Sequence, residues 1–176
     1  MRVVAGTHGG RRLTAPRGAA IRPTADRVRE ALFSILGPLG GARVLDLYAG
    51  AGTLGIEALS RGAVWATFVD VARPAVAAVE ANLEALGLAG DIVRADARTF
   101  LRNASAARHT YDLVLLDPPY RQAAGLGRDL SGPLRAVLAP AGRVVTESDR
   151  RAPLELDLRL DDERRYGDTI IRIHGS

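Results

Sequence analysis

Asp117, Pro118, Pro119 and Tyr120 stand directly after the apolar run at residues 111–116. Proline has no backbone N–H and a fixed φ, so two prolines in a row end a strand. The four residues therefore offer a carboxylate, a carbonyl of fixed direction and an aromatic ring at one strand end. Two acceptors and a stacking ring suit the exocyclic amine of a nucleobase. The simpler alternative is a proline turn that caps the strand and packs an aromatic side chain.

Such amines are poor nucleophiles because the nitrogen lone pair is delocalised into the ring. Hydrogen bonds to the Asp117 carboxylate and the Pro118 carbonyl would draw the nitrogen toward tetrahedral geometry, and a charged acceptor contributes about 1.5–3 kcal/mol. Stacking on Tyr120 would add about 1–3 kcal/mol. If a cofactor transferred a methyl group to this nitrogen, proximity to that donor should supply most of the rate. No general base would be needed before the transfer, because the proton becomes acidic once the nitrogen carries the methyl group.

Gly50, Gly52 and Gly55 form a G-x-G-x-x-G pattern after the strand-like run 44–47. Such glycines permit a tight turn and a close approach of backbone to a nucleotide cofactor. Asp70 ends the next strand-like run, where its carboxylate can accept hydrogen bonds from ribose hydroxyls. The pattern predicts an adenosine-bearing cofactor. The alternative is a glycine turn that only joins a strand to a helix.

Asp46 helps to distinguish between two adenosine-bearing cofactors, a nicotinamide dinucleotide and S-adenosylmethionine. It lies shortly before Gly50, where a carboxylate would repel a dinucleotide pyrophosphate and attract the positively charged methionine end of S-adenosylmethionine. Asp96 follows the third strand-like run and can accept a hydrogen bond from the adenine amino group, cap a helix, or do both. These acids favour S-adenosylmethionine over a nicotinamide cofactor.

Strand-like and helical patterns must position these residues. Apolar runs at 44–47, 66–69, 92–93, 113–116 and 143–146 alternate with helical patterns near 53–61, 74–86, 97–107 and 128–138. This alternation predicts five parallel strands with helices on both faces of the sheet. Residues 154–160 and 169–174 alternate between apolar and polar, with turn residues Asp161, Asp162 and 166–168 between them, so they should form an antiparallel hairpin. The expected fold is a seven-stranded, mostly parallel α/β sheet.

The composition limits the class of protein. A chain of 176 residues with 47% apolar residues should form one soluble core, and no apolar run approaches a membrane span or a signal-peptide core. Cysteine is absent, which excludes disulfides and thiolate metal sites. Three scattered histidines make a metal site unexpected. We expect a cytoplasmic protein that uses no metal and does not associate with a membrane.

Positive charge is concentrated at the N-terminus. Residues 1–30 hold seven arginines against Asp26 and Glu30, a net of +5, whereas the rest has 17 arginines and 18 acids, a net of −1. Residues 2–22 resemble a hairpin or extended arm, and residues 24–36 follow a helical pattern. The exposed face of that helix, opposite its apolar stripe, should carry Arg27 and Arg29. We therefore predict an extension at 1–38 that contacts a polyanion such as RNA, and a catalytic domain at 39–176. Five candidate phosphate ligands are Arg11, Arg12, Arg22, Arg27 and Arg29. The alternative is a solvated basic extension.

Several motifs resemble one known family. Residues 45–57 and 117–120 resemble class I S-adenosylmethionine-dependent amino methyltransferases, and residues 22–33, 57–63, 82–88 and 166–169 are similar to the bacterial RsmD family. Members of that family methylate N2 of one guanine in 16S ribosomal RNA. The sequence departs from the family pattern at two positions. The family often has glutamate where this chain has Asp70, and an arginine is expected where this chain has Gly9.

The resemblance implies a role for each motif. The methionine end of S-adenosylmethionine would lie at Asp46 and the loop from Gly50 to Gly52, its ribose at Asp70, and its adenine at Asp96 and Ala97. Tyr48 would also contact the cofactor. The target base would meet Asp117, Pro118, Pro119 and Tyr120. The substrate would be presented by an assembling or assembled small ribosomal subunit, and the enzyme is expected to be a monomer.

Three other functions fit parts of the pattern. A DNA or RNA adenine-N6 methyltransferase is one alternative, because such enzymes share the aspartate-proline-proline-tyrosine motif. The chain is short, however, for an enzyme with a separate target-recognition domain. A nicotinamide-dependent dehydrogenase would explain the glycine pattern, although His8, His109 and His174 lie in poor contexts for a proton donor. A non-catalytic RNA-binding module would explain only the basic N-terminus.

Overall fold

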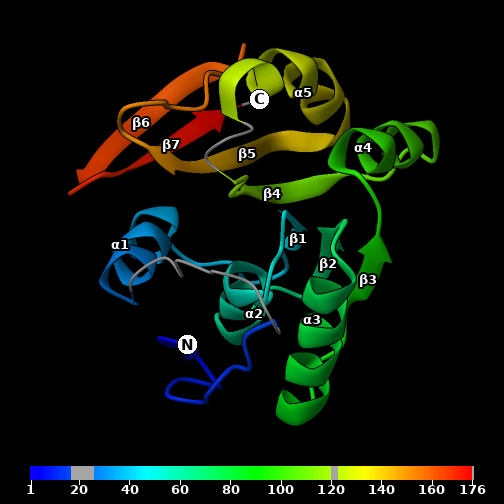
Figure 1. Cartoon of the computed structure of the whole chain (residues 1–176), viewed down its shortest axis with the longest axis vertical. Helices are drawn as coiled ribbons and strands as arrows, with labels where there is room; N and C mark the ends of the chain where they lie inside the picture. The colour runs from blue at the N-terminus through cyan, green and yellow to red at the C-terminus, as the bar shows by residue number, and fades with distance from the viewer. Residues whose placement is uncertain (17–25, 120–122, 176) are drawn as a thin grey trace.

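The computed structural model describes residues 1–16, 26–119 and 123–175. Its centre is a seven-stranded sheet with the order β3-β2-β1-β4-β5-β7-β6 (Figure 1). The strands are β1 (Arg43–Leu47), β2 (Trp65–Asp70), β3 (Asp91–Arg94), β4 (Tyr111–Leu116), β5 (Leu138–Asp149), β6 (Arg159–Tyr166) and β7 (Thr169–Gly175). Strands β1 to β5 pair in parallel, and β7 runs antiparallel between β5 and β6. The mostly parallel sheet with a C-terminal antiparallel hairpin confirms the predicted fold class.

Helices cover both faces of this sheet. They are α1 (Asp26–Leu36), α2 (Thr53–Ser60), α3 (Arg73–Leu86), α4 (Ala97–Ala106) and α5 (Ala123–Val137). Helices α1, α2 and α3 lie on one face, and α4 and α5 lie on the other (Figure 1). Helix α3 has a proline in its first turn and ends at Gly87, whose φ of 66° suits a left-handed cap. Among the described residues, no helix is long and apolar enough to cross a membrane.

Alternating side chains of the strands build two cores. Val44 and Leu115 belong to the core beneath α1–α3, whereas Leu45 and Leu116 belong to the core beneath α4 and α5. A strand buried on both faces needs apolar residues at successive positions, as in these runs. The same alternation turns Asp46, which follows Leu45, toward the α1–α3 face.

The N-terminal residues form a small hairpin, as expected. Arg2 and Arg12 make an antiparallel bridge, and the Val3 N–H donates to the Arg11 carbonyl over 2.9 Å. Val3 and Leu13 are buried in the α1–α3 core. The basic segment is therefore anchored to the rest of the protein. The division at residue 38 and the RNA-contacting role of residues 1–38 stay predictions.

Several boundaries differ from those expected. Strand β6 begins at Arg159 and includes Asp161 and Asp162, so residues 154–160 are not one strand and these acids are not the turn. Leu154 is fully buried in the α4–α5 core, so alternation there reflects burial rather than strand pairing. The turn lies at Gly167, whose φ is 61°. Helix α5 begins earlier than residue 128, and β5 extends beyond 143–146.

Candidate cofactor and base-binding site

The carboxyl ends of β1, β4 and β5 lie side by side. Leu47 pairs with Leu116, and Leu116 pairs with Thr146, so the residues that follow these positions meet at one edge of the sheet. In open α/β sheets, ligands bind in the crevice at this edge. The glycine loop follows β1 and Asp117 follows β4, so the structure brings together the two motifs that the sequence analysis singled out.

The three glycines of the loop have different reasons to be glycine. An added Cβ at Gly52 would lie 3.2 Å from each of three side chains, and at Gly55 it would lie 2.4 Å from Phe68. At Gly50 the nearest atom would be the Tyr48 carbonyl oxygen at 4.0 Å, but the φ of 56° is left-handed. Gly52 and Gly55 therefore allow the helix to pack closely on the sheet. Gly50 shapes a turn with free space on its open side, as a ligand requires.

Asp46 is a buried carboxyl group behind this loop. Its Oδ2 accepts a hydrogen bond from the Gly55 N–H over 2.9 Å. Burial, with a smaller contribution from the charge of Asp70, raises the pKa of Asp46 to about 8. A buried carboxylate without a countercharge would be stabilised by a cation. The methionine end of S-adenosylmethionine carries such a cation.

Asp70 connects the end of β2 to the glycine loop. Its Oδ2 accepts a hydrogen bond from the Gly50 N–H over 2.9 Å, and its Oδ1 accepts one from the Ala72 N–H over 2.8 Å. Each carboxylate oxygen has a second lone pair, so ribose hydroxyls can still donate to it. Asp70 thus shapes the loop in addition to the cofactor role expected for it.

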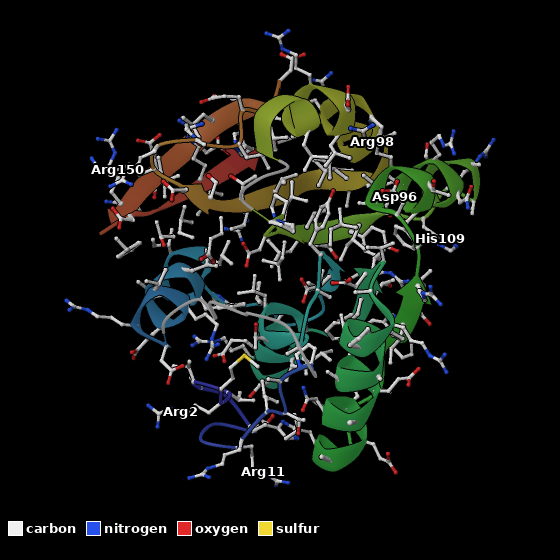
Figure 2. All side chains as sticks on the ribbon, viewed as in Figure 1. Arg2, Arg11, Asp96, Arg98, His109 and Arg150 are labelled. Atoms are coloured by element: carbon white, nitrogen blue, oxygen red, sulfur yellow. The ribbon has the colours of Figure 1, made fainter. Side chains whose placement is uncertain are left out.

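Asp96 is the N-cap of α4, one of the two roles expected for it. Its Oδ1 accepts hydrogen bonds from the N–H groups of Arg98 and Thr99 over 3.0 and 3.2 Å. Figure 2 shows Asp96 and Arg98 at the start of this helix. Tyr48 is half-buried, and burial followed by the charge of Asp96 raises the pKa of Tyr48. Ala97 is buried. Tyr48, Asp96 and Ala97 therefore lie on the α4 side of the glycine loop, where an adenine would be held.

Asp117 lies at the tip of β4, followed by buried Pro118 and exposed Pro119. Burial raises the pKa of Asp117 well above the usual value, and the negative charges of Glu147 and Asp46 raise it further. Tyr120 lies outside the described residues. Glu147, which is only 6% exposed near the end of β5, was not predicted as a site residue from the sequence. Its signal was an acid directly after the apolar run 143–146, in the same relation to its strand as Asp117.

The predicted RNA-contacting arginines have different environments. Arg11, Arg12 and Arg27 are exposed, and Figure 2 shows Arg11 at the N-terminal hairpin. Arg11 also donates to the Ala85 carbonyl at the end of α3 over 3.1 Å. Arg22 lies outside the described residues. These exposed arginines remain available for phosphate contacts.

Arg29 is fully buried, so the expectation that it lies on an exposed helix face is wrong. Its Nη2 donates to the Arg2 carbonyl over 2.5 Å and to Asp26 Oδ1 over 2.8 Å. Burial lowers the pKa of Arg29, and the negative charges of Asp26, Glu57 and Glu147 raise it in part. The N-terminal hairpin covers this side of α1, which helical periodicity alone does not reveal. In this structure Arg29 has no exposed surface with which to bind a phosphate.

Two further polar residues anchor the N-terminal hairpin. Buried Glu57 accepts hydrogen bonds from the N–H groups of Val4 and Ala5 over 2.6 and 3.0 Å and pairs with Arg61 over 2.7 Å. Buried Asn82 accepts from the Thr14 N–H over 2.7 Å. These contacts give a structural reason for the motifs at 57–63 and 82–88.

Known proteins resemble this chain over most of its length. The family model described as "Conserved hypothetical protein 95" matches residues 1–175. The Bacillus subtilis protein named "Putative rRNA methyltransferase YlbH" is 37% identical over 185 residues, covering 99% of this chain and 98% of that protein. The "Ribosomal RNA small subunit methyltransferase D" of Escherichia coli K12 is 39% identical over 125 residues, which cover 69% of this chain and 61% of that protein.

Solved structures share the whole fold. The Thermus thermophilus hypothetical protein TTHA0928 has a TM-score of 0.87 and 29% identity, covering 100% of this chain and 99% of that chain. The Escherichia coli protein yhhF, described as a "putative methyltransferase", has a TM-score of 0.83 and 33% identity, covering 99% of this chain and 97% of that chain. The fold is that of Rossmann-like S-adenosylmethionine-dependent methyltransferases. From the match over residues 1–175 and these relatives, the chain belongs to the family described as conserved hypothetical protein 95, the RsmD family that its motifs resemble.

Proposed function

We propose that this protein transfers a methyl group from S-adenosylmethionine to N2 of one guanine in the 16S RNA of the small ribosomal subunit. The relatives named as methyltransferases of ribosomal RNA support the substrate class, because one of them matches nearly the whole chain and another matches most of it. A bacterial ribosome is cytoplasmic, so the enzyme would act there. It would act as a monomer and without a metal ion.

The observation that carries this proposal is the position of Asp46 and Asp117 on the same face of adjacent strands. Asp46 lies on β1 beside the glycine loop, and Asp117 follows β4, whose register sets Leu116 against Leu47. The negative charge of Asp46 contributes to the raised pKa of Asp117, so the two groups are close. A methyl donor bound at the first carboxylate would therefore lie next to an amine bound at the second.

The site has the features that S-adenosylmethionine requires. Bound there, it would supply a methyl group on a positively charged sulfur. Asp46 would attract the cationic methionine end, the left-handed turn at Gly50 would leave room for it, and Asp70 would accept from the ribose. Tyr48, Asp96 and Ala97 would border the adenine. The raised pKa of Asp46 supports this fit, because a bound cation would stabilise the ionised carboxylate.

The chain itself would position the amine and then receive its proton. Asp117 and the Pro118 carbonyl would each accept one N–H of the guanine amine, and Pro119 would hold the turn. As the new N–C bond forms, the nitrogen becomes positively charged and its proton becomes acidic. Asp117 would accept that proton, since a carboxylate with a raised pKa is the stronger base. The base would stack on Tyr120, as expected from the motif.

The N-terminal hairpin would hold the RNA outside this pocket. Arg2, Arg11 and Arg12 are exposed on it and would contact phosphates, while a base splayed from a loop enters the site. Glu57 and Asn82 hold the hairpin against α2 and α3, so these cations have a defined position relative to the pocket. Such a grip needs no sequence-specific contact with the RNA.

The test is methyl transfer to small subunits that lack the modification. Labelled S-adenosylmethionine would be incubated with the enzyme and these subunits, and the digested RNA would be analysed by nucleoside mass spectrometry. We expect N2-methylguanosine at one position. The Asp117→Ala variant should be at least about 100-fold slower, because it lacks both the hydrogen-bond acceptor for the amine and the group that takes up its proton. Formation of N6-methyladenosine, or of no product, would overturn the proposal.

A further inference from the structure

We propose that Glu147 selects guanine by accepting the N1–H of the target base beside Asp117. The inference rests on the proposed function and deepens it, because the aspartate-proline-proline motif binds an amine without distinguishing guanine from adenine. It assigns to the end of β5 a part of the site that the sequence motifs do not cover.

The sheet register brings Glu147 to the site. Leu116 on β4 pairs with Thr146 on β5, so Asp117 and Glu147 are the next residues along two adjacent parallel strands. Adjacent strands lie about 4.8 Å apart. Leu115 and Val145, two positions earlier, both belong to the α1–α3 core, so the alternation turns Asp117 and Glu147 to that same face. Two carboxyl groups therefore lie side by side, next to Asp46.

Burial and charge agree with this placement. Glu147 is 6% exposed, so its side chain is buried rather than solvated at the surface. After burial, its charge is the largest contribution to the raised pKa of Asp117. This charge effect agrees with the side-by-side placement that the register of the two strands gives.

Arg29 supplies the positive charge in this region. It is fully buried, and its Nε and Nη1 have no hydrogen-bond partner among the described residues. The negative charge of Glu147 raises the pKa of Arg29, so the two groups attract each other. An arginine stays charged and favours the ionised form of a carboxyl group that it attracts. An ionised Glu147 can only accept hydrogen bonds.

Guanine matches a pair of acceptors. Its Watson–Crick edge has an N1–H donor next to the N2 amine, whereas adenine has an unprotonated N1 next to its amine. With the N2 amine on Asp117 and Pro118, the N1–H would donate to Glu147. An adenine in the same position would set its N1 lone pair against a carboxylate. The repulsion between this lone pair and the buried carboxylate is costly, and this cost excludes the wrong base.

The experiment compares guanine with 2-aminopurine at the target nucleotide, which is first located by mass spectrometry of the unsubstituted substrate. 2-Aminopurine keeps the N2 amine but has no hydrogen on N1. We expect the kcat/KM of the wild type to be higher for guanine than for 2-aminopurine by a factor on the order of 10 to 100. This factor is counted in addition to any effect of the O6 atom that 2-aminopurine also lacks. In Glu147→Gln the amide can donate to N1 of 2-aminopurine, so the preference should fall by about the same factor.

Controls separate this role from a structural one. Glu84→Gln changes an exposed glutamate of α3 and should keep the wild-type preference. Glu147→Asp retains an acceptor with a shorter reach, so it should lose rate but still prefer guanine. If Glu147→Gln fails to fold, Glu147→Asp still tests the proposal, because an unchanged rate would contradict it. An unchanged preference in Glu147→Gln would overturn the inference alone, whereas absence of N2-methylguanosine with the wild type would overturn the proposed function.

Discussion

The side chain of Asn82 on α3 donates a hydrogen bond to the carbonyl of Ala51 in the glycine loop over 2.9 Å. The same amide nitrogen donates to the Thr14 carbonyl over 3.0 Å. One buried amide therefore joins the end of the N-terminal hairpin to the loop expected to bind the cofactor. In the proposed function, this link joins the segment that would contact the RNA to the loop that would hold the methyl donor.

Asn82→Ala should lower both stability and cofactor affinity. The change leaves the buried Ala51 carbonyl and the Thr14 backbone without partners, at a cost of about 1–3 kcal/mol in the free energy of unfolding. Urea unfolding measures that cost, and calorimetry with S-adenosylmethionine measures the affinity, which should fall about tenfold because the loop is less well held. Asn103→Ala, on the exposed side of α4, is the matched control. Equal behaviour of the two variants would show that the Asn82 link does not support the loop.

Binding of S-adenosylmethionine should strengthen as pH rises. Burial raises the pKa of Asp46 to about 8, so in the free protein this group holds a proton near pH 7. The cationic cofactor favours the carboxylate, and binding therefore releases a proton. Affinity should rise up to about pH 8 and then level. Calorimetry in two buffers of different ionisation enthalpy would detect the proton release, which Asp46→Asn should abolish. Release of equal size from Asp46→Asn would assign the effect to another group.

The same group should affect stability in the opposite direction. The usual pKa of this carboxyl is 3.8 and the folded value is about 8, so the folded protein binds more protons than the unfolded chain between these values. The contribution of Asp46 to stability is therefore fully present below pH 3.8 and is lost as pH rises through about 8. Unfolding of wild type and Asp46→Asn at pH 6 and pH 9 would measure it. The wild type should lose stability relative to the variant at the higher pH.

Two glycine substitutions should separate packing from ligand access. Gly52→Ala adds a Cβ 3.2 Å from Ile56, Phe68 and Val79 at a φ of 76°, so it should cost about 2–4 kcal/mol of stability through strain and overpacking. Gly50→Ala meets open space at a φ of 56°, so its cost should be only about 1–2 kcal/mol. Thermal unfolding and calorimetry would give the two effects. A larger loss of stability in Gly50→Ala than in Gly52→Ala would contradict this division.

Arg12→Ala should weaken binding of the RNA substrate without affecting the cofactor. Removal of one exposed phosphate contact should raise KM for small subunits and reduce the slope of log affinity against log salt by about 1. Arg150→Ala, an exposed arginine at the end of β5, is a control for net charge. Filter binding across a salt series would measure both slopes. If the salt-dependence slope changes equally in the two variants, the effect comes from net charge in general rather than from a phosphate contact made by the hairpin.

Much of the fold follows from local patterns. The strand-like runs and helical stripes from residue 43 to residue 146 predict the alternation of β1–β5 with α2–α5, because each run buries its side chains in a regular period. The glycine loop and the prolines after Leu116 were predictable for the same reason, since they interrupt that period at strand ends. The pattern failed at residues 154–160, where apolar side chains alternate because they pack on a core rather than because they pair in a strand.

The order of the elements, the glycine loop and the position of Asp46, Asp70, Asp96 and Asp117 near strand ends could all be predicted from the amino-acid order alone. The burial of Arg29 and the placement of Glu147 beside Asp117 could not, because they depend on how the elements pack. Periodicity describes one element at a time, and on that basis Arg29 was expected on an exposed face. Its burial depends on the N-terminal hairpin, and the position of Glu147 depends on the register of β4 and β5. Both relationships join segments that are distant in the chain, and only packing brings such segments into contact.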